Sequence, residues 1–155
     1  MIFQKSAMPK IKISQGDWVI VCDGRKALIL ENVGDEKFAN LKTREVIEQK
    51  NPPTHVQGAD APGRAIGSVG SARSAVRQTD WHDEAERAFL HDLVRRLDAA
   101  LSARQAHSFI LVAPPRALGM IRQAYSQAVR LAVRREVDKD FVKMPVHEIE
   151  KHLTG

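Results

Sequence analysis

Two short apolar runs near the start of the chain constrain the fold more than any other feature. Residues 18–22 (WVIVC) and 27–30 (ALIL) are almost wholly hydrophobic, and Asp23 and Gly24 lie between them. An Asp-Gly pair in this position predicts a β-hairpin with a type I′ turn, which needs positive φ at both central residues. Near-continuous apolarity further predicts strands that are covered on both faces. The chain therefore begins with part of a buried sheet.

The rest of the chain alternates between strand and helix patterns. In order, we expect a third strand at about 38–49, a helix from an N-cap at Asp80 to Leu101, a strand at 108–113, a helix from Pro115, either more helix or a last strand at 131–137, and a short helix from Pro145. Charged side chains such as Lys42 and Arg44 indicate that the third strand lies at a sheet edge. This order predicts an α/β sandwich in which a mixed five-stranded sheet, an antiparallel meander plus two strands after crossover helices, is flanked by helices.

The length of 155 residues predicts a single domain. We expect a flexible N-terminal segment at 1–11 and one α/β domain at 12–153. No apolar run is long enough to cross a membrane, and the first residues lack the pattern of a signal peptide. The single cysteine, Cys22, excludes an internal disulfide and a cysteine-only metal site. These features predict a cytoplasmic protein without a membrane partner or cofactor, and they leave its oligomeric state open.

Residues 50–80 have no hydrophobic periodicity and are rich in proline, glycine, alanine and serine. A stretch of this length is well beyond the usual loop of about 12–15 residues, which is typical of a functional or a disordered segment. The residues that would make it a flexible, positive contact loop are the glycines and serine at Gly63, Gly67, Ser68 and Gly70 and the arginines at Arg64, Arg73 and Arg77.

The chain is basic, with 24 Lys and Arg against 19 Asp and Glu, a net charge of +5 and a pI near 9.6. Two interpretations stay open, a charge that serves solubility and a polyanionic partner. For a partner, the candidate binding residues are Arg64, Arg73, Arg77 and Arg116. Arg116 follows two prolines at a helix start, where free amides favour anions, although an ordinary turn explains the pattern too. A second group, which a solvated face also explains, comprises Arg122, Arg130, Arg134 and Arg135.

No pattern of a catalytic site is evident, so we predict no catalytic residues and no metal ligands. The carboxylates that could be imagined as a two-metal nuclease cluster are Asp17, Asp23, Asp138 and Asp140, but turn chemistry accounts for them as well. His147 and His152 are five residues apart, whereas a zinc-binding helix places its histidines four apart on one face. Cys22 lies in an apolar strand and is expected to be a buried hydrophobe rather than a nucleophile.

Three spaced motifs resemble the bacterial host attachment protein family. They are 113–119 (APPRALG), 136–140 (EVDKD) and 145–153 (PVHEIEKHL), and the opening residues 18–27 fit the same family. The resemblance covers about residues 12–153. It implies a role in the attachment of bacteria to host cells, which is a biological setting rather than a chemistry.

The order of elements is also similar to that of the middle domain of archaeal and eukaryotic peptide-chain release factors, which implies a ribonuclease-H-like sandwich. In those factors a long glycine-rich loop carries Gly-Gly-Gln into the peptidyl-transferase centre. The corresponding stretch here is 63–71 (GRAIGSVGS), and Gly-Gly-Gln occurs nowhere in the chain. Hydrolysis of peptidyl-tRNA therefore does not follow from the resemblance.

The first functional hypothesis is a non-enzymatic, release-factor-like module that binds RNA or a ribosome-associated partner through its basic loop. A second is an interaction protein that affects attachment indirectly, and a third, weaker one is a metal-dependent nuclease.

Overall fold

The computed structural model describes residues 10–50 and 71–155, with the side chains of 71–80 excepted. Within these residues the elements follow in the order β1 (Trp18–Cys22), β2 (Lys26–Asn32), β3 (Leu41–Glu48), α2 (Ser71–Ser102), β4 (Phe109–Ala113), α3 (Pro115–Ala124), α4 (Gln127–Ala132), β5 (Val133–Asp138) and α5 (Val146–Thr154). The strands form one sheet in the order β3-β2-β1-β4-β5. The first three strands pair antiparallel, and β1–β4 and β4–β5 pair in parallel. The predicted mixed five-stranded α/β sheet is confirmed.

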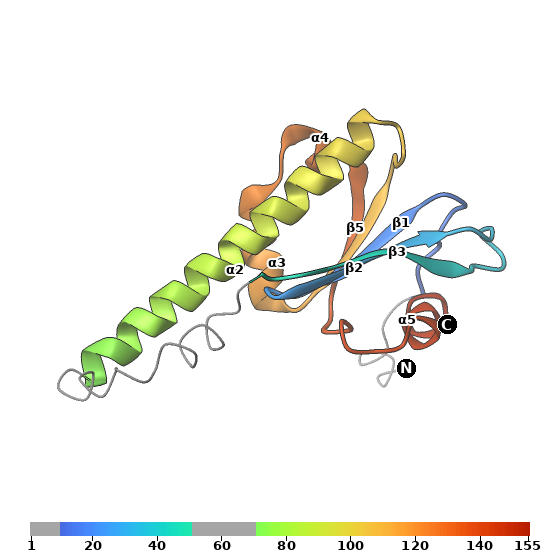
Figure 1. Ribbon diagram of the computed structural model, residues 1–155. Helices are drawn as coiled ribbons and strands as arrows, with labels where there is room; N and C mark the ends of the chain where they lie inside the picture. The colour runs from blue at the N-terminus through green and yellow to red at the C-terminus, as the bar shows by residue number, and fades with distance from the viewer. Residues whose placement is uncertain (1–9, 51–70) are drawn as a thin grey trace, which may run out of the picture.

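Helices cover both faces of this sheet (Figure 1). Trp18, Ile20 and Cys22 of β1 pack toward α2, α3 and α4 in one apolar cluster. Val19 and Val21 point the other way and pack with α5 and the segment before β1. Because both sides of β1 are buried, its sequence is apolar throughout and does not alternate. The prediction of a strand covered on both faces is confirmed.

The two edges of the sheet differ in sequence from its centre. β3 is mostly exposed and carries the charged residues that predicted an edge position. β5 forms the opposite edge, and α4 ends directly before it at Ala132. The choice between helix and strand at 131–137 is therefore resolved, since both occur in succession.

The hairpin between β1 and β2 forms, but the predicted type I′ turn is wrong. Among the described residues, positive φ occurs only at Gly16, Arg104 and Gly155. Instead, an oxygen of the Asp23 carboxylate accepts hydrogen bonds from two backbone N–H groups of the following residues, each at 2.8 Å. Position 24 has no room for a side chain, because a Cβ there would lie 2.7–2.9 Å from the side chain of Glu86 on α2. This explains the glycine.

Helix α2 is longer than the sequence pattern predicted. It begins at Ser71, so Asp80 is not its N-cap and residues 71–80 are not part of the loop. Residues 71–79 contain no glycine or proline and include several good helix formers, so helix can propagate from the amphipathic part toward the N-terminus. The first turns of α2 extend beyond the sheet (Figure 1).

The N-terminal side of the domain extends slightly further than predicted. Ile11, the last residue of the segment expected to be flexible, is buried against the α5 face. Its N–H donates a hydrogen bond of 2.8 Å to the carbonyl of Leu153. This bond holds Ile11 against α5, and its side chain forms one side of the groove described next.

Candidate functional site

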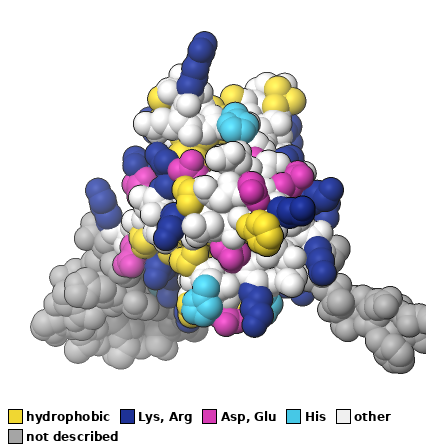
Figure 2. All heavy atoms as spheres, turned by 90° about the vertical axis from the view of Figure 1, so that its right-hand side faces the viewer, with side chains coloured by type: hydrophobic (Ala, Val, Ile, Leu, Met, Phe, Trp, Pro, Cys, Tyr) yellow, Lys and Arg dark blue, Asp and Glu magenta, His cyan; other side chains and the backbone are white. Residues whose placement is uncertain are grey.

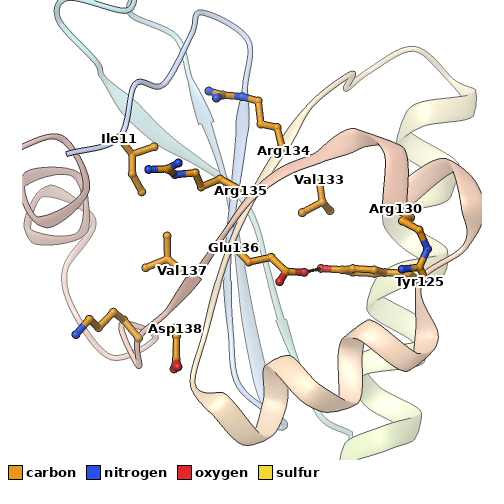
Figure 3. A pocket seen from close by; sticks show the side chains of 10 residues that line it. Ile11, Tyr125, Arg130, Val133, Arg134, Arg135, Glu136, Val137 and Asp138 are labelled. Atoms are coloured by element: carbon orange, nitrogen blue, oxygen red, sulfur yellow. Dashed lines mark hydrogen bonds between the residues drawn. The ribbon is translucent and has the colours of Figure 1, made fainter. Parts of the chain in front are cut away.

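A groove of about 830 Å³ lies along β5, the edge strand at the α4 side of the sheet. Residues of β5 form most of its surface, Ile11 closes one side, and Tyr125 and Arg130 close the other. In Figure 3, Arg134 and Arg135 lie on the side of Ile11, and Glu136 points toward Tyr125. The groove therefore has an edge strand as its base and two different walls.

The groove is positively charged. Four basic side chains line it, against the carboxylates of Glu136 and Asp138. Within the described part of the chain, no carboxylate oxygen lies within 4 Å of the charged nitrogens of Arg130, Arg135 or Lys139. All three side chains are exposed. Their charge is thus available to an anion that enters the groove.

A hydrogen-bonded network fixes the wall formed by α3 and α4. The Glu136 carboxylate accepts from the Tyr125 hydroxyl at 2.7 Å and from Arg122 Nε at 2.9 Å and Nη2 at 2.6 Å. Burial raises the pKa of Glu136, but the hydrogen bonds from Arg122 and Tyr125 outweigh it, so that the pKa lies below its ordinary value. Burial and the bond to Glu136 raise the pKa of Tyr125, which therefore stays protonated.

This network also positions one of the available cations. The guanidinium carbon of Arg130 lies 5.6 Å from the centre of the Tyr125 ring, close enough for a cation–π contact. The Tyr125 hydroxyl donates a hydrogen bond to Glu136, which fixes the ring (Figure 3). The fixed ring in turn positions Arg130 at the edge of the groove. Arg130 forms no ion pair within 4 Å among the described residues, although its charge helps to lower the pKa of Glu136.

The opposite wall is fixed by Arg134. Its Nη2 donates to Asp17 Oδ2 at 2.5 Å and to the carbonyl oxygen of Lys12 at 2.6 Å. Asp17 is 2% exposed and also accepts from the N–H of Ser14. Arg134 thus ties the N-terminal segment to β5. Arg134 therefore shapes the groove, but its charge is already neutralised by Asp17.

Three arginines of the second sequence-predicted group line this groove, namely Arg130, Arg134 and Arg135. The residues predicted for the basic loop are not among those that the structure shows there. Gly63, Arg64, Gly67, Ser68 and Gly70 lie outside the described residues. Arg73 and Arg77 lie on the first turns of α2, and their side chains are outside the described part of the structure.

Arg116 lies at the other candidate anion site, at the start of α3. It forms ion pairs with Asp83 and with Glu86, the latter at 2.5 Å. A crevice of about 500 Å³ adjoins it, outside the carboxyl ends of β1 and β4. An anion there would have to displace two carboxylates from Arg116, so the geometry favours the β5 groove.

The carboxylates considered for a metal site are dispersed. Asp17 precedes β1 and pairs with Arg134, whereas Asp23 follows β1 and caps the hairpin. Asp138 ends β5, and Asp140 follows it two residues later. Across residues 10–50 and 71–155, no group of three or more His, Cys, Asp or Glu side chains could hold a metal ion.

The remaining candidates have structural explanations. Cys22 is buried in the core, and burial together with the nearby Asp23 charge raises the pKa of its thiol to about 12. His152 contacts the ring of Phe141 and the carbonyl of Glu148. His147 is exposed beside Glu148. These groups do not converge on a common site.

Sequence reasoning missed Tyr125 and Lys139. It grouped Arg130, Arg134 and Arg135 with Arg122 as one set of candidate phosphate-binding residues, but it placed them in no groove. The signal that could have found the groove is that β5 follows α4 without a linker and carries two adjacent arginines at a sheet edge.

Basic side chains are not clustered everywhere on the surface. On the face shown in Figure 2, Lys and Arg side chains alternate with Asp and Glu side chains. On this face, positive and negative side chains are thus mixed rather than separated. Among the described residues, no helix has the length and apolarity needed to span a membrane.

The fold and groove define a small α/β sandwich domain with a basic edge strand. Residues 18–153 match the family described as "Protein required for attachment to host cells", and the chain belongs to that family. The predicted family membership is confirmed. No curated protein matches the chain.

Among solved structures, the chain is similar to the archaeal translation termination factor aRF1. The TM-score is 0.43 at 11% sequence identity, over 87% of this chain and 34% of that chain. The chain thus spans about a third of the length of the factor. The ribonuclease-H-like character of the sandwich stays a prediction.

Proposed function

We propose that this host attachment family domain binds RNA through the β5 groove. The observation that carries the proposal is the set of three exposed cations, Arg130, Arg135 and Lys139, in one groove and without a carboxylate partner among the described residues. Phosphate contacts by Lys and Arg supply most of the affinity in non-specific nucleic-acid binding. The net charge of +5 favours the same class of partner.

The expected binding mode is contact with the phosphate backbone. The groove offers guanidinium and ammonium groups, whereas its one aromatic ring, Tyr125, is already covered by Arg130 and bonded to Glu136. Stacking on bases is therefore a minor contribution, and little discrimination among base sequences is expected. The proposal includes no catalytic step.

The basic segment predicted from the sequence extends the proposal. Arg64, Arg73 and Arg77 would add phosphate contacts if they follow the strand beyond the groove. Arg116 is a weaker candidate because Asp83 and Glu86 occupy its guanidinium. We place this binding in the cytoplasm, where a ribosome-associated RNA is one form of the partner.

A fluorescence anisotropy titration with a labelled single-stranded RNA tests the proposal. We expect saturable binding at low salt that is lost in the Arg130→Ala/Arg135→Ala double variant. The control is Arg95→Ala, which removes an exposed arginine of α2 that does not line the groove. Absence of binding by the wild-type chain, or equal affinity of the double variant and the wild type, would contradict the proposal.

The family description supports a second candidate function, an interaction role that affects attachment to host cells. A deletion strain complemented with the wild-type chain or with the groove double variant separates the two roles. If adhesion is restored by both, attachment does not depend on the groove. If only the wild type restores it, the attachment phenotype depends on the groove.

A further inference from the structure

The loop that joins β2 to β3 exposes two hydrophobic side chains. Phe38 is 75% exposed and Val33 is 47% exposed. Scattered apolar residues are normal on a protein surface, but aromatic side chains are enriched where proteins contact one another. The loop lies at the outer end of the hairpin, apart from α4 (Figure 1). Phe38 is therefore a candidate anchor for a partner.

Hydrogen bonds hold this loop in one conformation. The buried carboxamide oxygen of Asn32 accepts from the N–H of Gly34 at 2.9 Å and from the N–H of Asn40 at 2.8 Å. The Asp35 carboxylate accepts from the N–H of Phe38 at 2.6 Å. Because the loop is already ordered in the free chain, binding of the Phe38 side chain costs little further conformational entropy.

A hollow of about 540 Å³ between the end of α2 and α4 has a mainly apolar lining. Leu131 of α4 lines it and is 75% exposed. The other hydrophobic residues of the lining are Leu101, Ala106, Ala128 and Ala132. Because three of these are alanines, the hollow leaves room beside Leu131 for a large hydrophobic side chain from outside.

The charges beside the loop and the hollow are opposite in sign. The loop carries Asp35 and Glu36 against Lys37, which gives two negative charges and one positive charge, or −1. The hollow is lined by Arg104 and His107 and by no acidic residue of the described chain. Neither Glu36 nor Arg104 forms an ion pair within 4 Å among the described residues. Such complementarity favours the correct partner and orientation.

We propose that the chain associates with a second copy of itself, the Phe38 loop of one copy entering the α2–α4 hollow of the other. Phe38 packs against Leu131, so the contact covers the two most exposed large hydrophobic side chains of the described residues. Glu36 pairs with Arg104 at the rim. Because the loop and α4 lie apart in one chain, no copy fills its own hollow (Figure 1).

The contact joins two different surfaces, so each associated pair retains one free loop and one free hollow. Such head-to-tail contacts continue into longer assemblies unless a ring closes. The hollow shares no lining residue with the β5 groove, so this proposal is independent of RNA binding.

Sedimentation velocity tests the proposal across a concentration series of the chain. We expect the average sedimentation coefficient of the wild type to rise between about 10 µM and about 1 mM, because a contact smaller than a standard interface is weak. Phe38→Ser and Leu131→Ser should each remain monomeric. The matched control is Val46→Ser, which changes an exposed hydrophobic residue of β3 outside both surfaces and should associate like the wild type.

A mixture of the two monomeric variants separates this contact from other modes of association. Phe38→Ser keeps an intact hollow, and Leu131→Ser keeps an intact loop. An equimolar mixture should therefore form a 1:1 complex although neither variant associates alone. The complex stops at two copies, because its remaining loop lacks Phe38 and its remaining hollow lacks Leu131.

The proposal is overturned if the wild type stays monomeric up to about 1 mM, a limit that corresponds to very weak affinity. It is also overturned if either loop or hollow variant associates like the wild type, if Val46→Ser loses association to the same extent, or if the mixed variants form no complex. Both substituted positions are exposed, and melting curves that match the wild type exclude a folding defect as the cause.

Discussion

The charge at the β5 groove predicts a specific dependence of RNA affinity on salt. Three groove cations have no carboxylate within 4 Å in the described residues, so each is available for one phosphate. Each contact with a single strand contributes about −0.7 to the slope of log K against log salt concentration, so three contacts give about −2. Affinity should then fall roughly 20-fold between about 50 and about 200 mM salt.

Single substitutions show how much each groove cation contributes to this slope. Lys139→Ala removes one available cation, and we expect the slope to become shallower by about 0.7. Lys42→Ala is the matched control, because Lys42 is an exposed lysine on β3 at the opposite edge of the sheet. The assay is fluorescence anisotropy across a salt series. Equal slopes for Lys139→Ala and the wild type, or an equal loss in the Lys42→Ala control, would refute the assignment of phosphate contacts to the groove.

Three further predictions concern the folded state. Gly24→Ala introduces a Cβ within 2.7 Å of Glu86, and we expect a loss of about 1–2 kcal/mol and a fall in Tm of roughly 2–8 °C; an unchanged melting curve would contradict this close approach. Because the pKa of Glu136 is lowered by folding, its ionised form stabilises the fold above the ordinary carboxyl pKa, and this contribution disappears as pH falls through the lowered pKa. Glu136→Gln should therefore lower Tm near neutral pH but much less in acid, and a deficit that persists at pH below 3 would argue against the network. The thiol of Cys22, with a pKa of about 12, should resist a thiol reagent at pH 8 until urea unfolds the chain, whereas rapid labelling of the native protein would show that it is accessible.

The sheet was predictable because its signals are local. The apolar runs of β1, β2 and β4 and the prolines before α3 and α5 are each contained within a few residues. Even the position of β3 at an edge followed from its charges. These features depend on residues that are close together in the chain, so they can be predicted from a single sequence.

What the sequence did not predict depends on contacts across the fold. The lack of space for a side chain at Gly24 is caused by Glu86, more than 60 residues away in the chain. Arg134 and Arg135 are adjacent in sequence, yet Asp17 neutralises one and, in the described structure, no carboxylate pairs with the other. In a sequence-based count of charges the two arginines are equivalent. Only the folded structure shows which of them is ion-paired and which can bind an anion.

Helix α2 leaves the body of the domain just beyond the ion pairs that Arg116 forms with Asp83 and Glu86 (Figure 1). Its first turns have no strand beneath them, whereas the part of the helix from Phe89 to Ala100 is buried on the sheet. The direction in which the projecting turns run is thus set by the apolar packing of the buried part, and the exposed ion pairs of Arg116 add little to it.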